Sequence, residues 1–450
     1  MRMVIKSDQK SRFIFNGLVA TIIASRLLTF FAFPNGFTSP DSDTYLAKEW
    51  LDFSNVSFIG HAIRPWPVPL IYALLGNIHL IIFFQLVLSG FVWIHLLRVI
   101  NKSLVTSAKK SLLLMAIVIL SISPQVIQWD TALLATSLLF STLILLISLS
   151  LQISFHKFRE SQNILFIAIV IFLLCQKISN LVIVLMFWIL LFVCLRSKVK
   201  KIFIMTLTLG IIYGCLLGFN IDKYWKASYS GTSMLWQLGK QNPSASSFKD
   251  FLIQHSAPSC VTQNAPFGDI SYESSRILNS CPESIPYLRD QFSSDFIKFS
   301  ITDPKEVAYS MIQGSGALLS NQSSNYGGSI TLLPSPINSL IFGTSSPDFK
   351  NMGIDSQIEG ADAIGPNKPF WVFTPQILFL FLGPVLLIRQ KFKGGKTLLL
   401  LWIGLVIEIC INLYLIPGEW VRQSTPFLVS AIALSLAMII KSESSSGVSK

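Results

Sequence analysis

Two acids lie close together at the start of the first polar segment of the chain, which reads Pro40-Asp41-Ser42-Asp43-Thr44-Tyr45. A proline followed by an acid is typical of a helix start, where a carboxylate stabilises the positive end of the helix dipole. The same carboxylates could act as general bases. On such a helix Asp41, Tyr45 and Lys48 share one face, beside an apolar stripe suited to the membrane surface.

A second polar segment, residues 60–72, contains one basic residue among prolines. Arg64 is followed by Pro65, Pro67 and Pro69, which restrict the chain where it returns to an apolar run. An arginine in such a place can bind a phosphate through two parallel hydrogen bonds, or it can extend its charged group to the membrane interface. His61 is the one histidine among these outer polar segments.

Three more charged residues flank apolar runs on the same side of the predicted membrane. Asp130 lies between two such runs with no basic residue near it in the sequence, so it either caps the following helix or faces inward toward the first acids. Glu419 and Arg422 are three residues apart before another run, where they could pair with each other or face a substrate.

Ionisable residues also occur inside the apolar runs. Arg26 and Glu408 are examples. A charged side chain that faces lipid raises the free energy of the protein, so an ionisable residue inside a span is first taken as a candidate functional residue. These two residues could neutralise one another, or they could line the pathway of a transporter.

The composition identifies the chain as a polytopic membrane protein. Of its 450 residues 52% are apolar and only 13% are charged, with a mean hydropathy of +0.59. Soluble proteins carry about 25% charged residues, so an ordinary cytosolic enzyme, a disordered chain and a fibrous repeat are excluded. The sequence motifs of zinc proteases, P-loop ATPases and serine hydrolases are absent.

The apolar runs predict an all-α membrane protein with about ten transmembrane helices. Each run approaches the roughly 20 residues needed to cross a bilayer. The predicted spans cover residues 13–33, 77–97, 111–128, 131–153, 162–176, 179–195, 202–219, 371–388, 397–416 and 424–440.

Lysine and arginine cluster in alternate gaps between these runs, which predicts that both termini are cytoplasmic. This pattern also explains the net charge of +12 as a consequence of membrane topology, so nucleic acid is not an expected partner.

A long outer loop follows the seventh predicted span and is expected to fold as a small domain. It contains Cys260 and Cys281. These cysteines are expected to form a disulfide if the outer compartment is oxidising, and the alternative is two free thiols. The predicted divisions are residues 1–219 as a membrane module with outer loop 34–76, residues 220–370 as the outer domain, and residues 371–450 as the last spans with a cytoplasmic tail.

The order of these features resembles the membrane glycosyltransferases of the GT-C superfamily. The resemblance rests on segments 41–46, 64–70, 124–130 and 419–422, in that order, and on the large outer loop after the seventh span. The most similar branch contains protein mannosyltransferases and aminoarabinose lipid A transferases.

The resemblance implies roles for individual residues. Asp41 matches the base that activates the acceptor through its spacing to the following aromatic, with Asp43 close by, and Asp130 matches a second acidic site. Arg64 and Arg422 match basic positions that hold the phosphate of the donor. Tyr45, His61 and Glu419 complete the predicted substrate contacts.

The implied reaction transfers a sugar from a polyprenyl-phosphate donor to a lipid, glycan or protein acceptor on the outer side of the membrane. The implied location is the inner or plasma membrane of a bacterium, in contact with membrane lipids. A divalent metal ion is left open as a cofactor, because many relatives carry a glutamate where this chain reads Ala135-Thr136-Ser137. The alternatives are a lipid-linked polysaccharide polymerase or ligase, and a transporter or flippase of lipid-linked or anionic substrates.

Overall fold

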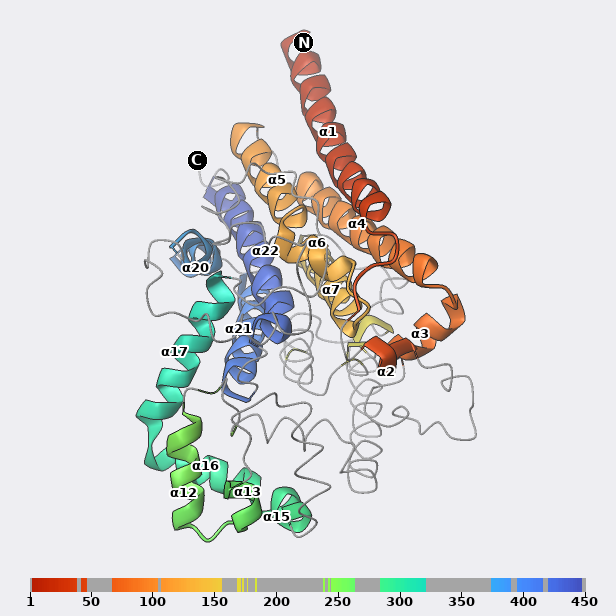
Figure 1. The fold of residues 1–450 in the computed structure, drawn as a ribbon. Helices are drawn as coiled ribbons and strands as arrows, with labels where there is room; N and C mark the ends of the chain where they lie inside the picture. Colours follow the sequence, from red (N-terminus) through yellow and green to blue (C-terminus); the bar gives the residue numbers. More distant parts are fainter. Residues whose placement is uncertain are drawn as a thin grey trace.

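The protein is a bundle of long helices with a smaller helical cluster at one end, as shown by a computed structural model (Figure 1). Within the described part of the chain the extended structure is limited to an isolated bridge between Phe37 and Ala132. The structure describes residues 2–38, 42–46, 67–103, 107–155, 168–170, 172, 173, 176, 183, 238, 242, 244–263, 284–320, 374–389, 395–415 and 420–446.

Four helices in these ranges are long and apolar enough to cross a membrane, and three shorter apolar helices accompany them. The long ones are α1 (Arg2–Ala32), α4 (Ile78–Ser103), α7 (Ala135–Phe155) and α21 (Gly395–Leu415). The shorter apolar stretches belong to α5 (Ser107–Ser121), α20 (Thr374–Arg389) and α22 (Trp420–Ser446).

The prediction of about ten spans is therefore corrected to four in the described part of the chain. One reason is that the predicted 111–128 run is interrupted after Ser121, and Pro124 then starts the separate short helix α6 (Pro124–Asp130). The predicted 162–176, 179–195 and 202–219 runs fall almost wholly outside the described residues.

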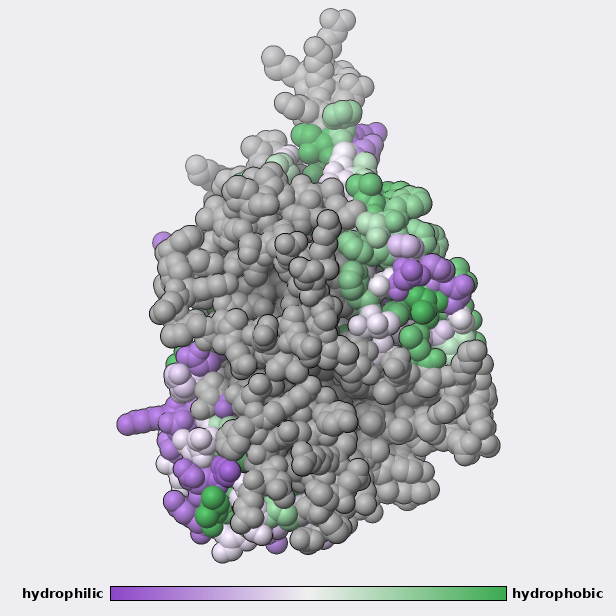
Figure 2. Space-filling view, viewed as in Figure 1, coloured by the Kyte–Doolittle hydropathy of each residue, from purple (hydrophilic) through white to green (hydrophobic). Residues whose placement is uncertain are grey.

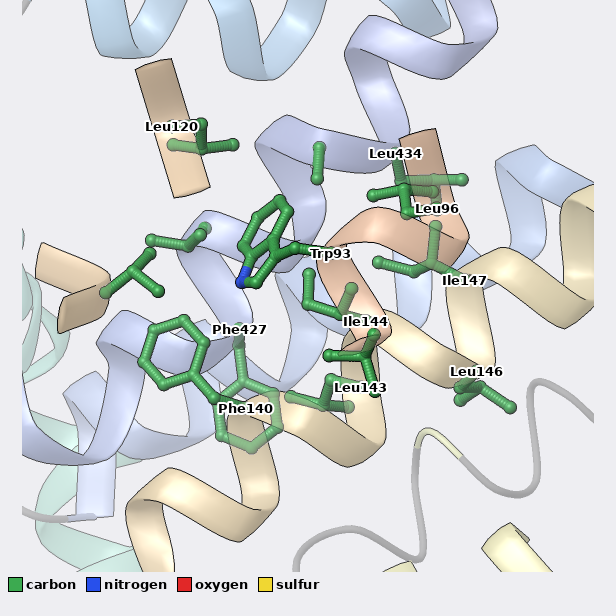
Figure 3. Close-up of a cluster of buried hydrophobic side chains, with 14 of the residues drawn as sticks. Trp93, Leu96, Leu120, Phe140, Leu143, Ile144, Leu146, Ile147, Phe427 and Leu434 are labelled. Atoms are coloured by element: carbon green, nitrogen blue, oxygen red, sulfur yellow. The ribbon is translucent and has the colours of Figure 1, made fainter. Parts of the chain in front are cut away.

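Large apolar side chains from α4, α5, α7 and α22 interlock at the centre of the bundle (Figure 3). Trp93 of α4 packs near Phe140 of α7 and Phe427 of α22, and all three are almost completely buried. In lipid, such close packing is a main source of helix association because the apolar side chains gain little from leaving hydrocarbon.

The outer surface of α1 and α4 is apolar, as expected for helices that face lipid. Figure 2 shows hydrophobic residues gathered over this part of the molecule, and hydrophilic residues mixed among apolar ones over the opposite, lower part. The exposed apolar side chains include Phe13, Leu27 and Phe31 of α1 together with Phe83 and Phe91 of α4. The chain is thus built as a membrane-embedded helical protein.

The last helices pack closely because a glycine replaces a side chain at their contact. The Gly383 amide of α20 donates a hydrogen bond of 3.0 Å to Ser435 Oγ of α22. A Cβ atom at Gly383 would overlap the backbone of Ser435, so only glycine permits this approach.

A second apolar core joins the helices of the long outer loop. Phe248 lies at its centre, with the rings of Phe292, Phe296 and Phe299 between 5.0 and 5.5 Å away. The helices in this region are α12 (Ala245–Gln254), α13 (Ser259–Gln263), α15 (Ser284–Asp290), α16 (Phe292–Thr302) and α17 (Pro304–Ser320).

This cluster is attached to the bundle at the end of α21. The Tyr414 hydroxyl is 2.6 Å from Ser300 Oγ of α16, and its ring lies 5.0 Å from that of Phe296. In Figure 1 the cluster of α12, α13, α15 and α16 lies at the end opposite the start of α1 and the end of α22.

Candidate functional site

The structure describes only part of the predicted site. Tyr45 is described fully, as is Asp130, whereas Asp43 in helix α2 (Ser42–Leu46) and Arg422 in α22 are described only as members of their helices. The predicted site residues that lie outside the described ranges are Asp41, His61, Arg64, Glu419 and Cys281.

Asp130, the last residue of α6, is completely buried and forms an ion pair. Its Oδ2 lies 3.5 Å from Nη2 of Arg26, which lies in the last third of α1 and is itself only 4% exposed. Arg26 also donates hydrogen bonds to Ser25 Oγ at 3.0 Å and to Ser89 Oγ of α4 at 3.1 Å. No basic residue lies near Asp130 in the sequence, and the fold supplies its cation from a distant part of the chain.

The suggested pairing of Arg26 with Glu408 is wrong. Arg26 makes its ion pair with Asp130 of α6, while Glu408 is buried on α21. Arg26 and Glu408 therefore do not neutralise one another.

Burial controls the protonation of Asp130, which lies between the spans on α6. Desolvation raises the pKa of this carboxyl from 3.8 to about 6, and Arg26 and Ser89 oppose that rise by a smaller amount. Near neutral pH the carboxylate and the guanidinium are both charged and attract each other.

The beginning of the first outer loop is bonded to the residues that follow Asp130. The Phe37 amide donates to the Thr131 carbonyl at 2.9 Å, and the Leu133 amide donates to the Phe37 carbonyl at 3.0 Å. Thr131 directly follows Asp130, and Phe37 is four residues before Asp41. The backbone thus brings the segment that leads to the first pair of acids beside the second acidic site.

A tight turn makes this contact possible. Pro34 follows the end of α1, and its carbonyl lies 3.0 Å from Nδ1 of His79 at the start of α4. Gly36 has a φ of +61°, a conformation that favours glycine, and a Cβ there would overlap the Ile82 side chain and the Thr131 carbonyl.

A buried hydrogen-bond network supports the same region from α3 (Pro67–Leu75). The Tyr72 hydroxyl donates to the Leu134 carbonyl at 2.8 Å. Gln85 of α4 donates through Nε2 to the Tyr72 hydroxyl and, at 3.2 Å, to the Ala132 carbonyl. Tyr45 is buried on α2, which packs on α3, so this residue helps to hold α2 in place.

An apolar cavity of about 110 Å³ lies between α5, α17, α20 and α22. Its lining includes Leu120, Leu318, Phe379 and Val429, with Gln376 and Thr425 as polar members. Arg422 precedes Thr425 by three residues on α22, about one helical turn. The cavity can hold a short stretch of hydrocarbon beside a helix that also carries a cation.

The outer helical cluster contains a buried tyrosine that is paired with an aspartate. The Tyr287 hydroxyl donates to Asp295 Oδ2 at 3.0 Å, and burial together with this carboxylate raises the pKa of Tyr287. Cys260 of α13 is disulfide-bonded. Its pairing with Cys281 stays a prediction, because Cys281 lies outside the described residues.

The described part of the chain does not assemble a metal site. It contains no group of three or more histidine, cysteine, aspartate or glutamate side chains with the necessary proximity. The carboxylate of Asp130 is already paired with Arg26, and Ala135, Thr136 and Ser137 supply no carboxylate. The described residues around Asp130 therefore do not by themselves form a divalent metal site.

The sequence contains a pattern that indicates the polar network around Arg26. Ser25, Arg26 and Thr29 lie within one apolar run, and Gln85 and Ser89 are four residues apart in the next. Polar residues at helical spacing inside two apolar runs indicate a shared polar face.

Comparison of the chain with protein-family models, with curated proteins and with solved structures gave no match.

Proposed function

We propose that this protein is an integral membrane glycosyltransferase. It transfers a sugar from a polyprenyl-phosphate donor to an acceptor on the extracytoplasmic side, with Asp41 as the general base. The proposal rests on the order of sequence motifs that resembles the GT-C superfamily and on the geometry around Asp130.

The observation that carries the proposal is the pairing of Phe37 with the α6–α7 connection. The resemblance requires the first outer loop and the segment between the third and fourth predicted spans to contribute to one site. Two backbone hydrogen bonds join these segments, at one and three residues after Asp130 and at four residues before Asp41.

The cavity between α5, α17, α20 and α22 supports a donor that carries a lipid chain. Its lining is mostly apolar, and Gln376 and Thr425 are its polar members. Arg422 and Thr425 both belong to α22 and are about one helical turn apart. A donor phosphate bound by Arg422 would therefore be close to the cavity that Thr425 lines.

The orientation of the elements supports an extracytoplasmic reaction. The outer-loop helices lie at the end of the molecule opposite the start of α1 and the end of α22 (Figure 1). With cytoplasmic termini, as the basic residues predict, these helices and α2 are outside.

The proposed chemistry is a single displacement. Asp41 accepts the proton of the acceptor hydroxyl or amine, the acceptor attacks the anomeric carbon, and the bond from that carbon to the phosphate oxygen breaks. Arg64 and Arg422 stabilise the charge on the departing polyprenyl phosphate. The configuration at the anomeric carbon is inverted.

Asp130 has a supporting role in this proposal. It is completely buried and paired with Arg26, so it lacks the access to substrate that a base requires. The pairing also counts against a transporter that uses Arg26 to bind an anion, because the guanidinium already has a carboxylate partner.

The proposal is tested with purified protein in lipid nanodiscs and a panel of polyprenyl-phosphate sugars. The expected result is release of polyprenyl phosphate, accelerated by a suitable acceptor, with the sugar recovered on that acceptor. Empty nanodiscs and heat-treated protein are the controls. Movement of an intact lipid-linked sugar across the membrane of sealed proteoliposomes, without cleavage of any donor in the panel, would support a flippase and contradict the proposal.

A further inference from the structure

The ion pair between Arg26 and Asp130 joins three elements at one buried point. Arg26 belongs to α1, its hydrogen-bond acceptor Ser89 belongs to α4, and Asp130 ends α6. All three side chains are at most 4% exposed. The charges are therefore removed from water at the position where the α6–α7 connection begins.

Stability alone does not explain this pair. Two buried charges lose their hydration, and apolar residues of similar size often replace such a pair without loss of stability. A buried ion pair does fix the relative position of its partners, because separating them leaves an uncompensated charge. The pair is suited to hold α6 at one height and rotation against α1 and α4.

The start of the first outer loop is hydrogen-bonded to the residues that directly follow α6. Asp130 is followed by Thr131, whose carbonyl accepts a hydrogen bond from Phe37, and by Leu133, whose amide donates to the same residue. Gly36 allows the close approach on the other side of the bridge. A shift of α6 would therefore move the backbone that leads to Asp41.

We propose that Arg26 and Asp130 are positioning residues that set the place of the first outer loop. Their effect on catalysis rests on the proposed function, while their effect on the loop does not. Neither side chain touches substrate. A base displaced by about 1 Å can lose roughly 100-fold in rate, so a fixed connection beside the loop is useful to an enzyme of this kind.

The position of the loop can be measured without substrate. In the double variant Phe37→Cys/Ala132→Cys, the paired backbone positions lie about 5 Å apart, which suits a disulfide. The membrane-embedded protein is equilibrated with mixtures of reduced and oxidised glutathione. Mass spectrometry of the peptide pair that contains residues 37 and 132 then gives the effective concentration of the two thiols.

Three changes are compared in this cysteine background. Asp130→Asn breaks the ion pair, and Arg26→Met/Asp130→Leu removes both charges, so it remains informative if the single change does not fold. Glu408→Gln is the matched control because it neutralises a buried acid on α21. The expected result is a fall in effective concentration of at least tenfold for the first two and no change for the control.

A positioning role also predicts a rescue of catalysis. In the Asp130→Asn variant, oxidation of the cysteine pair should restore at least tenfold in kcat, with the donor KM unchanged within about threefold. A purely structural role predicts that activity follows the melting temperature and that oxidation restores nothing.

Effective concentrations within twofold of the parent in both pair variants would overturn the proposal, as would the absence of rescue in an active enzyme. If the parent transfers no sugar, the proposed function fails, and the thiol measurement alone decides whether the pair positions the loop.

Discussion

At the scale of single residues, the ion pair between Arg26 and Asp130 links the membrane helices to the predicted chemistry. The carboxylate and the guanidinium are held 3.5 Å apart, and both side chains are buried. Residue types and spacing indicated that Asp130 was important, but they predicted that it caps the following helix or faces inward toward the first acids. Its partner was hidden because Arg26 and Asp130 meet only after the first, second and third membrane helices have packed.

The protonation of Asp130 makes stability depend on pH in a defined direction. Burial raises its pKa from 3.8 to about 6, so the folded protein holds this proton more tightly than the unfolded chain. This group therefore contributes stability that is fully present below about pH 4 and is lost as the pH rises through about 6. The melting temperature of the parent should fall relative to that of Asp130→Asn between pH 4 and pH 7.

The measurement is a pair of thermal melts in the same detergent at several pH values. Asn is neutral throughout, so the variant serves as the reference for all other titrating groups. A difference between parent and variant that is constant, or that grows in favour of the parent with rising pH, would contradict the raised pKa.

The two arginines assigned to the donor phosphate should affect binding more than chemistry. Arg64→Ala and Arg422→Ala remove cations that bind the phosphate in the ground state as well as in the transition state. We expect the donor KM to rise by about tenfold or more, with a smaller fall in kcat. Replacement by lysine should restore part of the loss, and kinetics with varied donor concentration would show an unchanged KM if the assignment is wrong.

At the scale of elements, much of the helical framework could be predicted from apolar runs, while their ends could not. The predicted 131–153 span begins at Ala135 in the structure. The residues before it are not helical because Thr131 and Leu133 form backbone hydrogen bonds with Phe37, which makes a β-bridge with Ala132. The predicted 111–128 span is divided by Ser123 and Pro124. Both differences lie at the candidate site, where tertiary hydrogen bonds override the hydrophobic pattern.

The turn before the first outer loop should tolerate no side chain. Gly36→Ala places a Cβ against Ile82 and the Thr131 carbonyl, in a backbone conformation that costs about 1–3 kcal/mol for other residues. We expect a lower melting temperature and a weaker Phe37–Thr131 contact.

Gly17→Ala provides the matched control for this prediction. Gly17 lies within α1, and nothing surrounds the position of its missing Cβ within 4 Å. Alanine should stabilise that helix by about 0.5–1 kcal/mol. Equal melting temperatures for the Gly36→Ala protein and the parent would show that the turn is less restricted than the structure indicates.

At the scale of the whole molecule, the outer helices form a separate core that is fixed to the end of α21 through Tyr414. The sequence predicted an outer domain from its polar composition and its aromatic residues. It could not predict that α17 would return to the bundle, where Leu318 lines the cavity with residues of α5, α20 and α22.

The disulfide provides a check on the side of the membrane that this cluster occupies. Cys260 is disulfide-bonded, and we predict that Cys281 is its partner in an oxidising, extracytoplasmic compartment. Peptide mapping without reduction should recover the two residues in one linked pair. A Cys281→Ala variant should leave Cys260 open to a thiol reagent applied from outside intact cells. Labelling of Cys260 only after the membrane is made permeable would contradict the predicted orientation.

The most direct test of the account compares Asp41→Asn with Asp43→Asn in the transfer of sugar from a lipid-linked donor that the parent uses. Asparagine is nearly the same shape as aspartate and can still cap a helix, so both proteins should fold. We expect Asp41→Asn to lose about two to four orders of magnitude in turnover, the usual contribution of a general base, and Asp43→Asn to lose far less. Near-normal turnover of the Asp41→Asn protein would contradict the assignment of Asp41 as the base.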